Sequence, residues 1–389
     1  MPWLSNPAKR AEPHRPARFG RLLTIGARTI AAGLSLTVLL ASGFAWATLN
    51  SLSAAVTVVP FHRSTPAAGA AAAPAGTEQN ILLVGDDSRQ GATAAELAAI
   101  GTDYSPGDNT DTIMVLHLPA DGRSAALMSF PRDSLINLPR GQGTGKINAA
   151  YSVGGGDAGG GPGALAEVIT RLTDLSIDHF MKISMLGFYR LSVAVGGVDL
   201  NLCHAQNAST EGDASHPNGY SGIDLKQGWN RGVQGKQALA FVRQRHGEGL
   251  SDYTRVQRQR YFLGALFGKL GTPANLTNPL LIGRVIKAVG TSLTVDGGLQ
   301  GGKLLTLAGQ LRSLTAGHLA LATIPMTGEL LVDGQYQGEQ IDTAAMPGFI
   351  ARFVGKAAPA TARPSGSTAA VGASNNPAVR TAADPSCVQ

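Results

Sequence analysis

The feature that most constrains this chain is a stretch without any charged residue, from Thr29 to Leu49. Its length matches the about 20 apolar residues that a helix needs to cross the core of a bilayer. Basic residues crowd the 28 positions before it, and none follows directly after it. By the positive-inside rule this asymmetry predicts a single membrane span, with the N-terminus in the cytoplasm and everything after about Asn50 outside the cell. A cleaved signal peptide is the alternative.

The two ends of the chain differ in composition from its middle. The segment after the uncharged stretch is rich in Ala, Gly and Pro, and the same composition returns after Val354. Such segments bury too little apolar surface to fold and are typical of tethers. The predicted organisation is a basic cytoplasmic tail (1–28), a transmembrane helix (29–49), an extracytoplasmic tether (50–79), one folded domain (80–354) and a low-complexity C-terminal tail (355–389).

The distribution of charge argues against one class of function. The formal net charge is +6, but most of it lies in the first 28 residues, and the rest of the chain is close to neutral. A nucleic-acid-binding domain usually carries a strongly basic face. We therefore expect no nucleic-acid partner. A membrane-linked transcriptional regulator is the least favoured alternative, because a domain outside the cell cannot meet the chromosome.

Short apolar runs alternate with segments of helical period inside the predicted domain. The runs are nearly continuous, which is typical of strands buried on both faces, and they cover Asn80–Asp87, Asp111–Leu118 and Ser124–Pro131. The helical segments that would cover such a sheet are Pro162–Leu175, Tyr253–Leu270 and Gly302–Leu314. This pattern predicts an α/β sandwich.

Arginines concentrate between Ala238 and Gln259. Arg243 and Arg245 are two residues apart, a spacing that turns both side chains to one face of a strand. A helix that begins near Asp252 would place Asp252, Arg255 and Gln259 on one of its faces. Clustered guanidinium groups repel each other unless an anion lies among them, and their planar forks suit phosphate oxygens. The cluster therefore indicates a phosphate ligand, with a solvated basic surface as the alternative.

Charged residues also follow or begin the apolar runs. Asp87 follows the first run, Asp111 begins the second, and Arg132 and Asp133 follow the third. Ligands of α/β sheets bind beyond the ends of the strands. A diphosphate is usually accompanied by a hard divalent cation, and Asp87 and Asp111 are carboxylates suited to hold it.

Five segments of the chain carry a resemblance to one protein family. They are NILLVGDDSR, NTDTIMVLHLPADGRSAALMSFPRDS, GKINAAYSVGG, DHFMKISMLGFYRLSVAVGGVDL and QALAFVRQRHGEGLSDYTRVQRQR. In this order, and behind a single N-terminal span, they are similar to the successive motifs of the LytR-CpsA-Psr family, from about Asn80 to Lys269. The resemblance implies a three-layer α-β-α sandwich with a mixed sheet. It also implies an extracytoplasmic phosphotransferase that moves a glycopolymer from a polyprenyl-pyrophosphate carrier to peptidoglycan and leaves a phosphodiester link.

The resemblance further implies roles for residues at motif positions. Mg²⁺ is expected at Asp87 and Asp111. The expected pyrophosphate-binding residues are Arg89, Arg132, Lys146, Arg243, Arg245, Arg255 and Gln259. The expected catalytic residues are Arg132, Arg243, Arg245 and Asp252, and Asp133 also falls on a motif position.

Two positions depart from the pattern of the family. Many members have arginine where this chain has Asn109, which removes one possible phosphate ligand. The first motif commonly has serine where Asp86 stands here, so either Asp86 or Asp87 could face the metal ion, and we favour Asp87.

Two other functions are compatible with the same features. A polyprenyl-pyrophosphate hydrolase would use water in place of the sugar acceptor, and a non-catalytic module would bind the lipid carrier or the wall glycan without transfer. In each case the apolar tail of the carrier predicts a deep apolar pocket beside the Pro162–Leu175 helix and the HFMKISMLGFYRL segment that follows it.

The chain has two cysteines, Cys203 and Cys387. In an exported chain they can form a disulfide, since the compartment is oxidising. A metal site with His204 and His216 is the alternative, but no second close cysteine supports it.

Overall fold

The computed structural model describes residues 56–66, 78–89, 91–100, 110–120, 125–207, 222–244, 252–270, 272–276, 278–300, 319–355, 380–381 and 387–388, with isolated positions between 31 and 43 and at 303 and 307. The chain divides into two compact units, Met1–Asn50 and Ser51–Gln389. In the described parts of the chain, no helix has the length and apolarity needed to cross a membrane. The predicted span at 29–49 falls largely outside the described residues and stays a prediction. The fold below is that of the second unit.

A mixed sheet forms the centre of this unit. Its strands, in spatial order, are β1 (Thr57–Val59), β10 (Leu293–Asp296), β7 (His179–Ser184), β2 (Gln79–Asp86), β3 (Thr110–Leu118), β4 (Ala125–Phe130), β11 (Leu319–Thr323) and β14 (Arg380–Thr381). Strand β3 is antiparallel to both of its neighbours, whereas β2 is parallel to β7 and β4 is parallel to β11. The predicted mixed sheet is confirmed.

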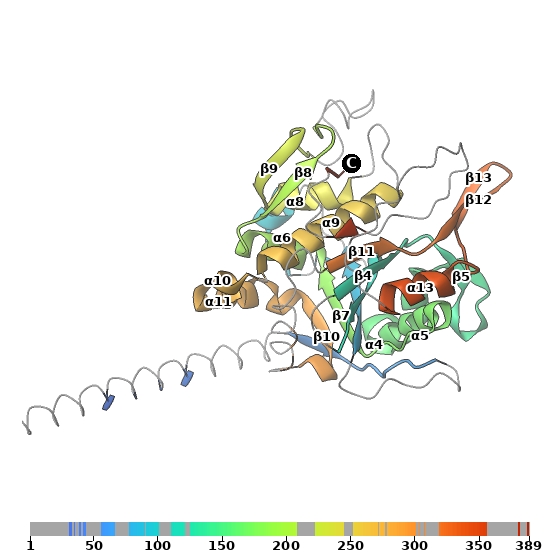
Figure 1. The fold of residues 1–389 in the computed structure, drawn as a ribbon, viewed down its shortest axis with the longest axis horizontal. Helices are drawn as coiled ribbons and strands as arrows, with labels where there is room; N and C mark the ends of the chain where they lie inside the picture. The colour runs from blue at the N-terminus through green and yellow to red at the C-terminus, as the bar shows by residue number, and fades with distance from the viewer. Residues whose placement is uncertain are drawn as a thin grey trace, which may run out of the picture. The chain divides into compact units, whose positions relative to one another are not determined.

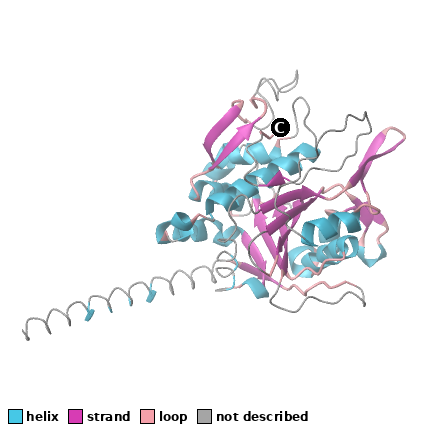
Figure 2. Cartoon of the chain, viewed as in Figure 1, coloured by secondary structure: helices cyan, strands magenta, loops and turns pink. Residues whose placement is uncertain are grey.

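Helices lie on both sides of the strands (Figures 1 and 2). The helices are α2 (Ala94–Ile100), α3 (Ala149–Val153), α4 (Gly156–Gly159), α5 (Gly161–Thr173), α6 (Met185–Ala194), α8 (Gly235–Arg243), α9 (Asp252–Leu270), α10 (Pro273–Leu276), α11 (Pro279–Val289) and α13 (Met346–Gly355). Three two-stranded sheets pair β5 (Leu135–Asn137) with β6 (Thr144–Lys146), β8 (Val198–Leu202) with β9 (Gly228–Val233), and β12 (Met326–Val332) with β13 (Gln335–Ile341).

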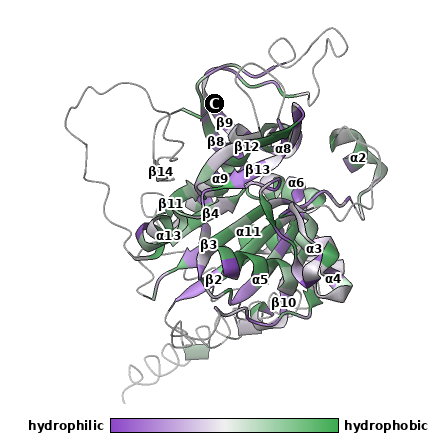
Figure 3. Cartoon of the chain, turned by 90° about the vertical axis from the view of Figure 1, so that its right-hand side faces the viewer, coloured by the Kyte–Doolittle hydropathy of each residue, from purple (hydrophilic) through white to green (hydrophobic). Residues whose placement is uncertain are grey.

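The two faces of the sheet belong to different cores. Leu82 and Val84 of β2 join a core that includes α5 and α13, while Ile81 of the same strand joins a core on the opposite face. Leu263 of α9 packs against that second core. The colouring in Figure 3 shows α11 as a largely hydrophobic helix. Because successive side chains of a strand point to opposite faces, both sets must be apolar, which explains the continuous apolar runs.

The predicted strands and helices agree with the structure where it describes them. Strands β2, β3 and β4 lie within a residue or two of the three apolar runs, and α5 and α9 match two of the three predicted helices. Most of the third, Gly302–Leu314, lies outside the described residues.

Two short strands of the sheet lie outside the predicted bounds of the domain, 80–354. Residues Thr57–Val59, which were expected to be tether, pair in parallel with β10 as the outermost strand of the sheet. In the expected C-terminal tail, Arg380 and Thr381 pair with β11. Both strands are short and lie in segments rich in Ala and Pro, so overall composition conceals them.

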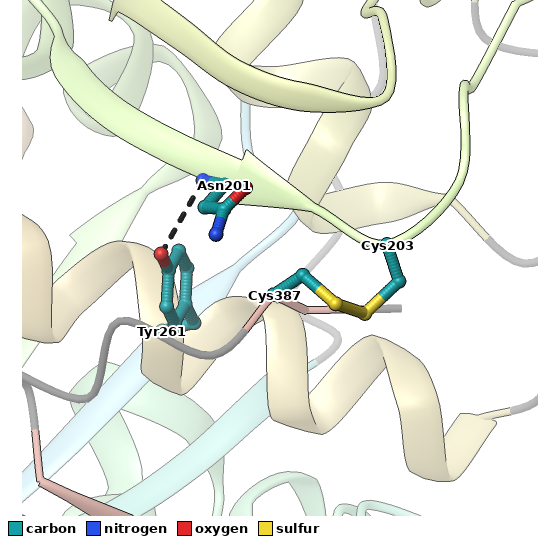
Figure 4. The surroundings of a disulfide bond; sticks show 4 residues. All are labelled: Asn201, Cys203, Tyr261 and Cys387. Atoms are coloured by element: carbon teal, nitrogen blue, oxygen red, sulfur yellow. Dashed lines mark hydrogen bonds between the residues drawn. A yellow bond between two sulfur atoms is a disulfide. The ribbon is translucent and has the colours of Figure 1, made fainter.

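A disulfide fixes the end of the chain to the domain (Figure 4). Cys203, just after β8, is bonded to Cys387. The backbone groups of Cys203 and Val388 form a hydrogen bond of 2.9 Å, and Val388 N donates to Asn201 O at 2.8 Å. The cross-link closes a loop of 184 residues, so it removes much freedom from the unfolded chain and stabilises the fold by about 2–4 kcal/mol. The disulfide is confirmed, and thiolate ligation of a metal at Cys203 is excluded in this oxidised state.

His117 is a buried polar residue within β3. Its Nδ1 lies 2.8 Å from Asn80 Oδ1, and Asn80 Nδ2 donates to Ser176 O at 2.9 Å. Since the amide oxygen accepts, Nδ1 carries the proton of the neutral ring. Burial lowers the pKa of His117 to about 4.

This pKa predicts a specific dependence of stability on pH. Between its unfolded pKa near 6.5 and its folded pKa, His117 binds a proton only in the unfolded chain, so the free energy of unfolding falls as the pH drops through this window. The loss by pH 4 is on the order of 3 kcal/mol. Urea denaturation of the wild type and of His117→Gln at pH 7.5, 5.5 and 4.5 measures it. The free energy of unfolding of the variant should fall less over this pH range than that of the wild type. An equal fall in both proteins would contradict the assignment to His117.

Candidate functional site

Strand direction gathers several of the predicted residues at one edge of the sheet. Because β3 runs against β2 and β4, its first residues lie beside the last residues of both neighbours. Asp87 and Arg89 follow β2, Asp111 lies at the start of β3, and Arg132 and Asp133 follow β4. Residues from three separate motifs are thus brought to a common edge.

Arg132 lies at the centre of a row of ion pairs. Its Nη1 donates to Asp111 Oδ1 at 2.6 Å, and its Nε lies 3.6 Å from Asp133 Oδ2. The other oxygen of Asp133 lies 3.1 Å from Lys146 Nζ, and the ammonium lies 5.2 Å from the centre of the Tyr336 ring on β13. The buried carboxylate of Asp133 therefore holds two cations in place. Tyr336 had not been predicted.

An irregularity in the sheet places Asp111. Gly85 is paired with Thr112 and Asp86 with Thr110, so Asp111 is an extra residue without an opposite partner in the register. Such a bulge bends the strand and redirects the side chain of the extra residue. It brings the Asp111 carboxylate to Arg132 and leaves it about one third exposed, at 32%.

Asp86 and Asp87 have different surroundings. Asp86 is buried, and its Oδ2 lies 2.9 Å from the Nζ of Lys182. Asp87 is 28% exposed, and its nearest recorded cation is the Nη2 of Arg89 at 3.4 Å. Asp87 is therefore the one of the two that an external cation can reach, which supports the choice made from the sequence without testing it.

Lys182 on β7 was missed by the sequence analysis. Its Nζ lies 2.9 Å from Asp86 Oδ2 and 2.7 Å from Asp157 Oδ2, and the hydroxyl of Tyr151 donates to the other oxygen of Asp157. Burial acts to lower the pKa of Lys182, but the two carboxylates outweigh it and hold that pKa above its usual value. The ammonium thus joins β2, β7 and α4. A lysine inside the apolar run HFMKIS was the available signal.

The predicted strand that carries Arg243 and Arg245 is wrong. Arg243 is the last residue of α8, and Ala238, Leu239 and Phe241 of this helix are buried in one core. The segment ALAFV has enough apolar residues for the inner face of a helix, so the spacing of two between the arginines does not place them on one face. Arg243 is exposed, and Arg245 lies outside the described residues.

Helix α9 begins at Asp252, as predicted, and its N-terminal half carries buried polar side chains. Gln259 Nε2 donates to Val242 O at 3.3 Å, which ties α9 to the end of α8 next to Arg243. Arg255 is almost fully buried on α9, a helix that contacts β4 and β11. The side chain of Asp252 is outside the described set.

Two further arginines of α9, Arg258 and Arg260, are also buried and were not predicted as part of the site. The guanidinium of Arg258 lies 5.6 Å from the centre of the Phe241 ring on α8. Arginines three and then two residues apart in TRVQRQR were the only signal, and this spacing does not distinguish buried from solvated side chains.

Comparison with known proteins identifies the family. A model described as the LytR_cpsA_psr family matches residues 56–346. The chain belongs to this family. The cell wall biosynthesis protein LcpA of Corynebacterium glutamicum is 33% identical over 312 residues, which cover 72% of this chain and 56% of LcpA. TagU of Oceanobacillus iheyensis, a polyisoprenyl-teichoic acid--peptidoglycan teichoic acid transferase, is 32% identical over 216 residues, 55% of this chain and 62% of TagU.

The fold is also shared with solved structures. The structure of TagT bound to LI-WTA, where TagT is a Bacillus subtilis protein, has a TM-score of 0.54 at 20% identity and covers 77% of this chain and 100% of that one. The likeness establishes the fold. The aligned parts span 56% of LcpA and 62% of TagU, so less than two thirds of either relative is matched.

The buried position of Lys182 predicts a large effect on stability. Replacing it in Lys182→Met leaves Asp86 and Asp157 without their counter-charge, and removing one partner of a buried pair costs about 3–5 kcal/mol. Urea denaturation measures the loss, and the double variant Lys182→Met/Asp86→Asn should recover part of it. Lys287→Met, at an exposed position of α11, is the matched control and should be nearly neutral. A Lys182→Met protein as stable as this control would contradict the role of the pair.

Proposed function

We propose that this protein is an extracytoplasmic phosphotransferase that moves a glycopolymer from a polyprenyl-pyrophosphate carrier to peptidoglycan. The observation that carries the proposal is the edge of the sheet where Arg89, Arg132 and Lys146 lie beside the partly exposed Asp87 and Asp111. The printed names of the relatives support it, since LcpA is a cell wall biosynthesis protein and TagU is a teichoic acid–peptidoglycan transferase.

The geometry suits the electrostatics of phosphoryl transfer. In the proposed reaction an acceptor hydroxyl forms a bond to the phosphorus next to the glycan, and the bond from that phosphorus to polyprenyl phosphate breaks. Negative charge grows on the leaving group. Arg132 and Lys146 are already held by Asp133, so they can stabilise this charge without first being ordered.

The proton of the acceptor hydroxyl needs a base. Asp252 stands at the first position of α9, three residues before Arg255. Two roles remain open for it in the proposed mechanism: it accepts this proton, or it orients Arg255 on the next turn. Arg243, Arg245, Arg255 and Gln259 complete the proposed pyrophosphate site.

The donor set also fits Mg²⁺, provided that the substrate supplies ligands. Carboxylate oxygens of Asp87 and Asp111 would hold the ion, which when bound neutralises charge on the phosphate groups. Within the part of the chain that the structure describes, no three His, Cys, Asp or Glu side chains gather as a metal cluster. Asp111 also forms an ion pair with Arg132. If the guanidinium of Arg132 binds a phosphate group instead, the Asp111 carboxylate loses its counter-charge and is available to bind a cation. Binding of the metal and of the diphosphate should therefore be coupled.

The location follows from the same proposal. We infer that residues 29–49 span the cell membrane once and that the catalytic domain lies outside. The disulfide between Cys203 and Cys387 supports a location outside the cytoplasm, because such bonds persist in oxidising compartments.

The apolar tail of the carrier would enter beside α5. Leu165 and Ile169 of this helix are buried against the sheet, so we expect α5 to shift when the carrier binds.

The first test replaces the arginine at the centre of the site. Arg132→Lys keeps the charge but loses the fork that meets two phosphate oxygens, so the rate of transfer should fall on the order of 10²-fold. The assay incubates the purified full chain with labelled lipid-linked glycan, with and without peptidoglycan. Arg171→Lys, an exposed arginine of α5, is the matched control and should keep full activity.

The same assay separates the alternatives. Release of the glycan without peptidoglycan would indicate a hydrolase, and retention of intact donor would indicate a binding module. An Arg132→Lys protein that transfers at the wild-type rate would overturn the role of the ion-paired arginine.

The second test concerns the metal ion. Calorimetry should show weak Mg²⁺ binding to the protein alone and at least about tenfold tighter binding with a methylene-bridged pyrophosphate analogue, because phosphate oxygens complete the coordination. Asp87→Asn and Asp111→Asn should each abolish this gain. Glu167→Gln, an exposed carboxylate on α5, serves as the control. If the wild type, the two aspartate variants and the Glu167→Gln control all bind Mg²⁺ with equal affinity, the two aspartates have a structural role only.

A further inference from the structure

A groove lies over β9, the residues just before it and the start of α8. Its volume is about 420 Å³. The side chains that line it include Lys226, Trp229, Arg231, Gln234 and Gln237. None of these residues belongs to the site described above. The wall therefore combines one large aromatic ring with cationic and amide groups.

Trp229 is the distinctive residue of this groove. It is 46% exposed, although tryptophan is usually among the more buried side chains. The guanidinium of Arg231, two residues further along β9, lies 5.1 Å from the centre of the indole ring, and its Nη1 donates to Asp199 Oδ2 at 2.6 Å. Arg231 thus lies over the ring and pairs with Asp199, which offsets the charge of its guanidinium.

The backbone beneath Trp229 is rigid. Asn230, the next residue, points inward, and its amide bonds to Lys226 N and O and to Gly228 O. Gln237 on α8 accepts from Asp224 N at 2.8 Å and donates to Gly222 O at 3.1 Å. The segment just before β9 is therefore tied both to β9 and to α8, so the exposed ring belongs to a formed surface.

We propose that this groove binds a saccharide chain, and that this chain is the glycan strand of the acceptor. A pyranose ring presents a face of C–H bonds and a rim of hydroxyls. An exposed indole attracts the slightly positive C–H face, and the neighbouring charged and amide groups can hydrogen-bond the rim. A neutralised cation beside the ring favours a polar, uncharged ligand over a purely apolar one.

The position of the groove supports the acceptor as the source of the saccharide, an assignment that rests on the proposed function. Helix α8 begins directly after β9, contributes Gln237 to the groove and ends at Arg243 of the proposed pyrophosphate site. From Gln237 to Arg243 the helix rises by about 9 Å. This rise is a distance that a strand of a few sugar units seated on Trp229 can span toward the proposed pyrophosphate site.

Fluorescence of Trp229 tests the groove without any need for activity. The chain has three tryptophans, and the other two, Trp3 and Trp46, lie in the N-terminal unit. In the detergent-solubilised full chain carrying Trp3→Phe and Trp46→Phe, all tryptophan emission comes from Trp229. Chitotetraose, an N-acetylated β-1,4 tetrasaccharide, should shift the emission to shorter wavelength and protect it from acrylamide in a saturable manner. Arg231→Ala in the same background should weaken this binding at least fivefold.

Maltotetraose distinguishes the two possible sources. It lacks the acetamido groups of a peptidoglycan strand, so we expect it to bind at least tenfold more weakly than chitotetraose. Equal binding of both sugars would overturn the assignment to the acceptor and point to the donor polymer. No spectral response to either sugar would overturn the saccharide site altogether.

Kinetics then separate this inference from the proposed function. Trp229→Ala should raise the KM for peptidoglycan about tenfold, with kcat and the KM for the lipid-linked donor unchanged, and Trp229→Phe should restore most of the loss. Leu280→Ala, at a 74% exposed position of α11, is the matched control for removal of a large apolar side chain. Transfer by Trp229→Ala with the wild-type KM would overturn the groove and leave the proposed function standing. A wild-type chain that binds chitotetraose but transfers no glycopolymer would overturn the proposed function and leave the saccharide groove standing.

Discussion

Strand β3 runs against both of its neighbours, and this antiparallel pairing creates the edge on which the site depends. The first residues of β3 lie beside the last residues of β2 and β4. Asp111, Arg132 and the pair Asp87 and Arg89 therefore lie at one edge of the sheet, although they come from separate parts of the chain. The bulge at Asp111 then directs one carboxylate toward Arg132. A shift of one residue in the pairing of β3 would turn its side chains to the opposite faces and break this contact.

Parallel strands on either side complete the arrangement. Strand β7 ends at the same edge as β2, and it carries Lys182, the ammonium that joins Asp86 to Asp157 on α4. A lysine so deeply buried is tolerated because two carboxylates surround it, and they in turn are held by its charge. The edge therefore carries two sets of ion pairs: one is centred on the buried Lys182 and Asp86, and the other includes the partly exposed Arg132 and Lys146.

The sequence predicted those features that depend on local pattern. Continuous apolar runs located β2, β3 and β4, and helical periodicity located α5 and α9, because burial on both faces of a sheet and on one face of a helix leaves a direct trace in residue order. The two-residue spacing of Arg243 and Arg245 is typical of a strand, but Arg243 ends a helix. The apolar residues before it form the inner face of α8 and determine the local structure. The pairing of Cys203 with Cys387 could be predicted because the chain has two cysteines in a segment expected outside the cell. The ion pairs of Lys182 depend on tertiary contacts that no local pattern records.

The charge balance of the edge supports the proposal that a cation and an anion bind there together. Arg132 is paired with Asp111 and Asp133, and Lys146 shares Asp133, so the described groups already form a nearly neutral set. A diphosphate that draws Arg132 and Lys146 toward itself leaves Asp111 and Asp133 with less counter-charge, and the buried Asp133 cannot replace that counter-charge with water. An anion alone would therefore exchange one set of ion pairs for another at little gain. In the proposed function, a divalent cation at the partly exposed Asp87 and Asp111 would remove that competition, so the affinity for the substrate would depend on these carboxylates as much as on the arginines.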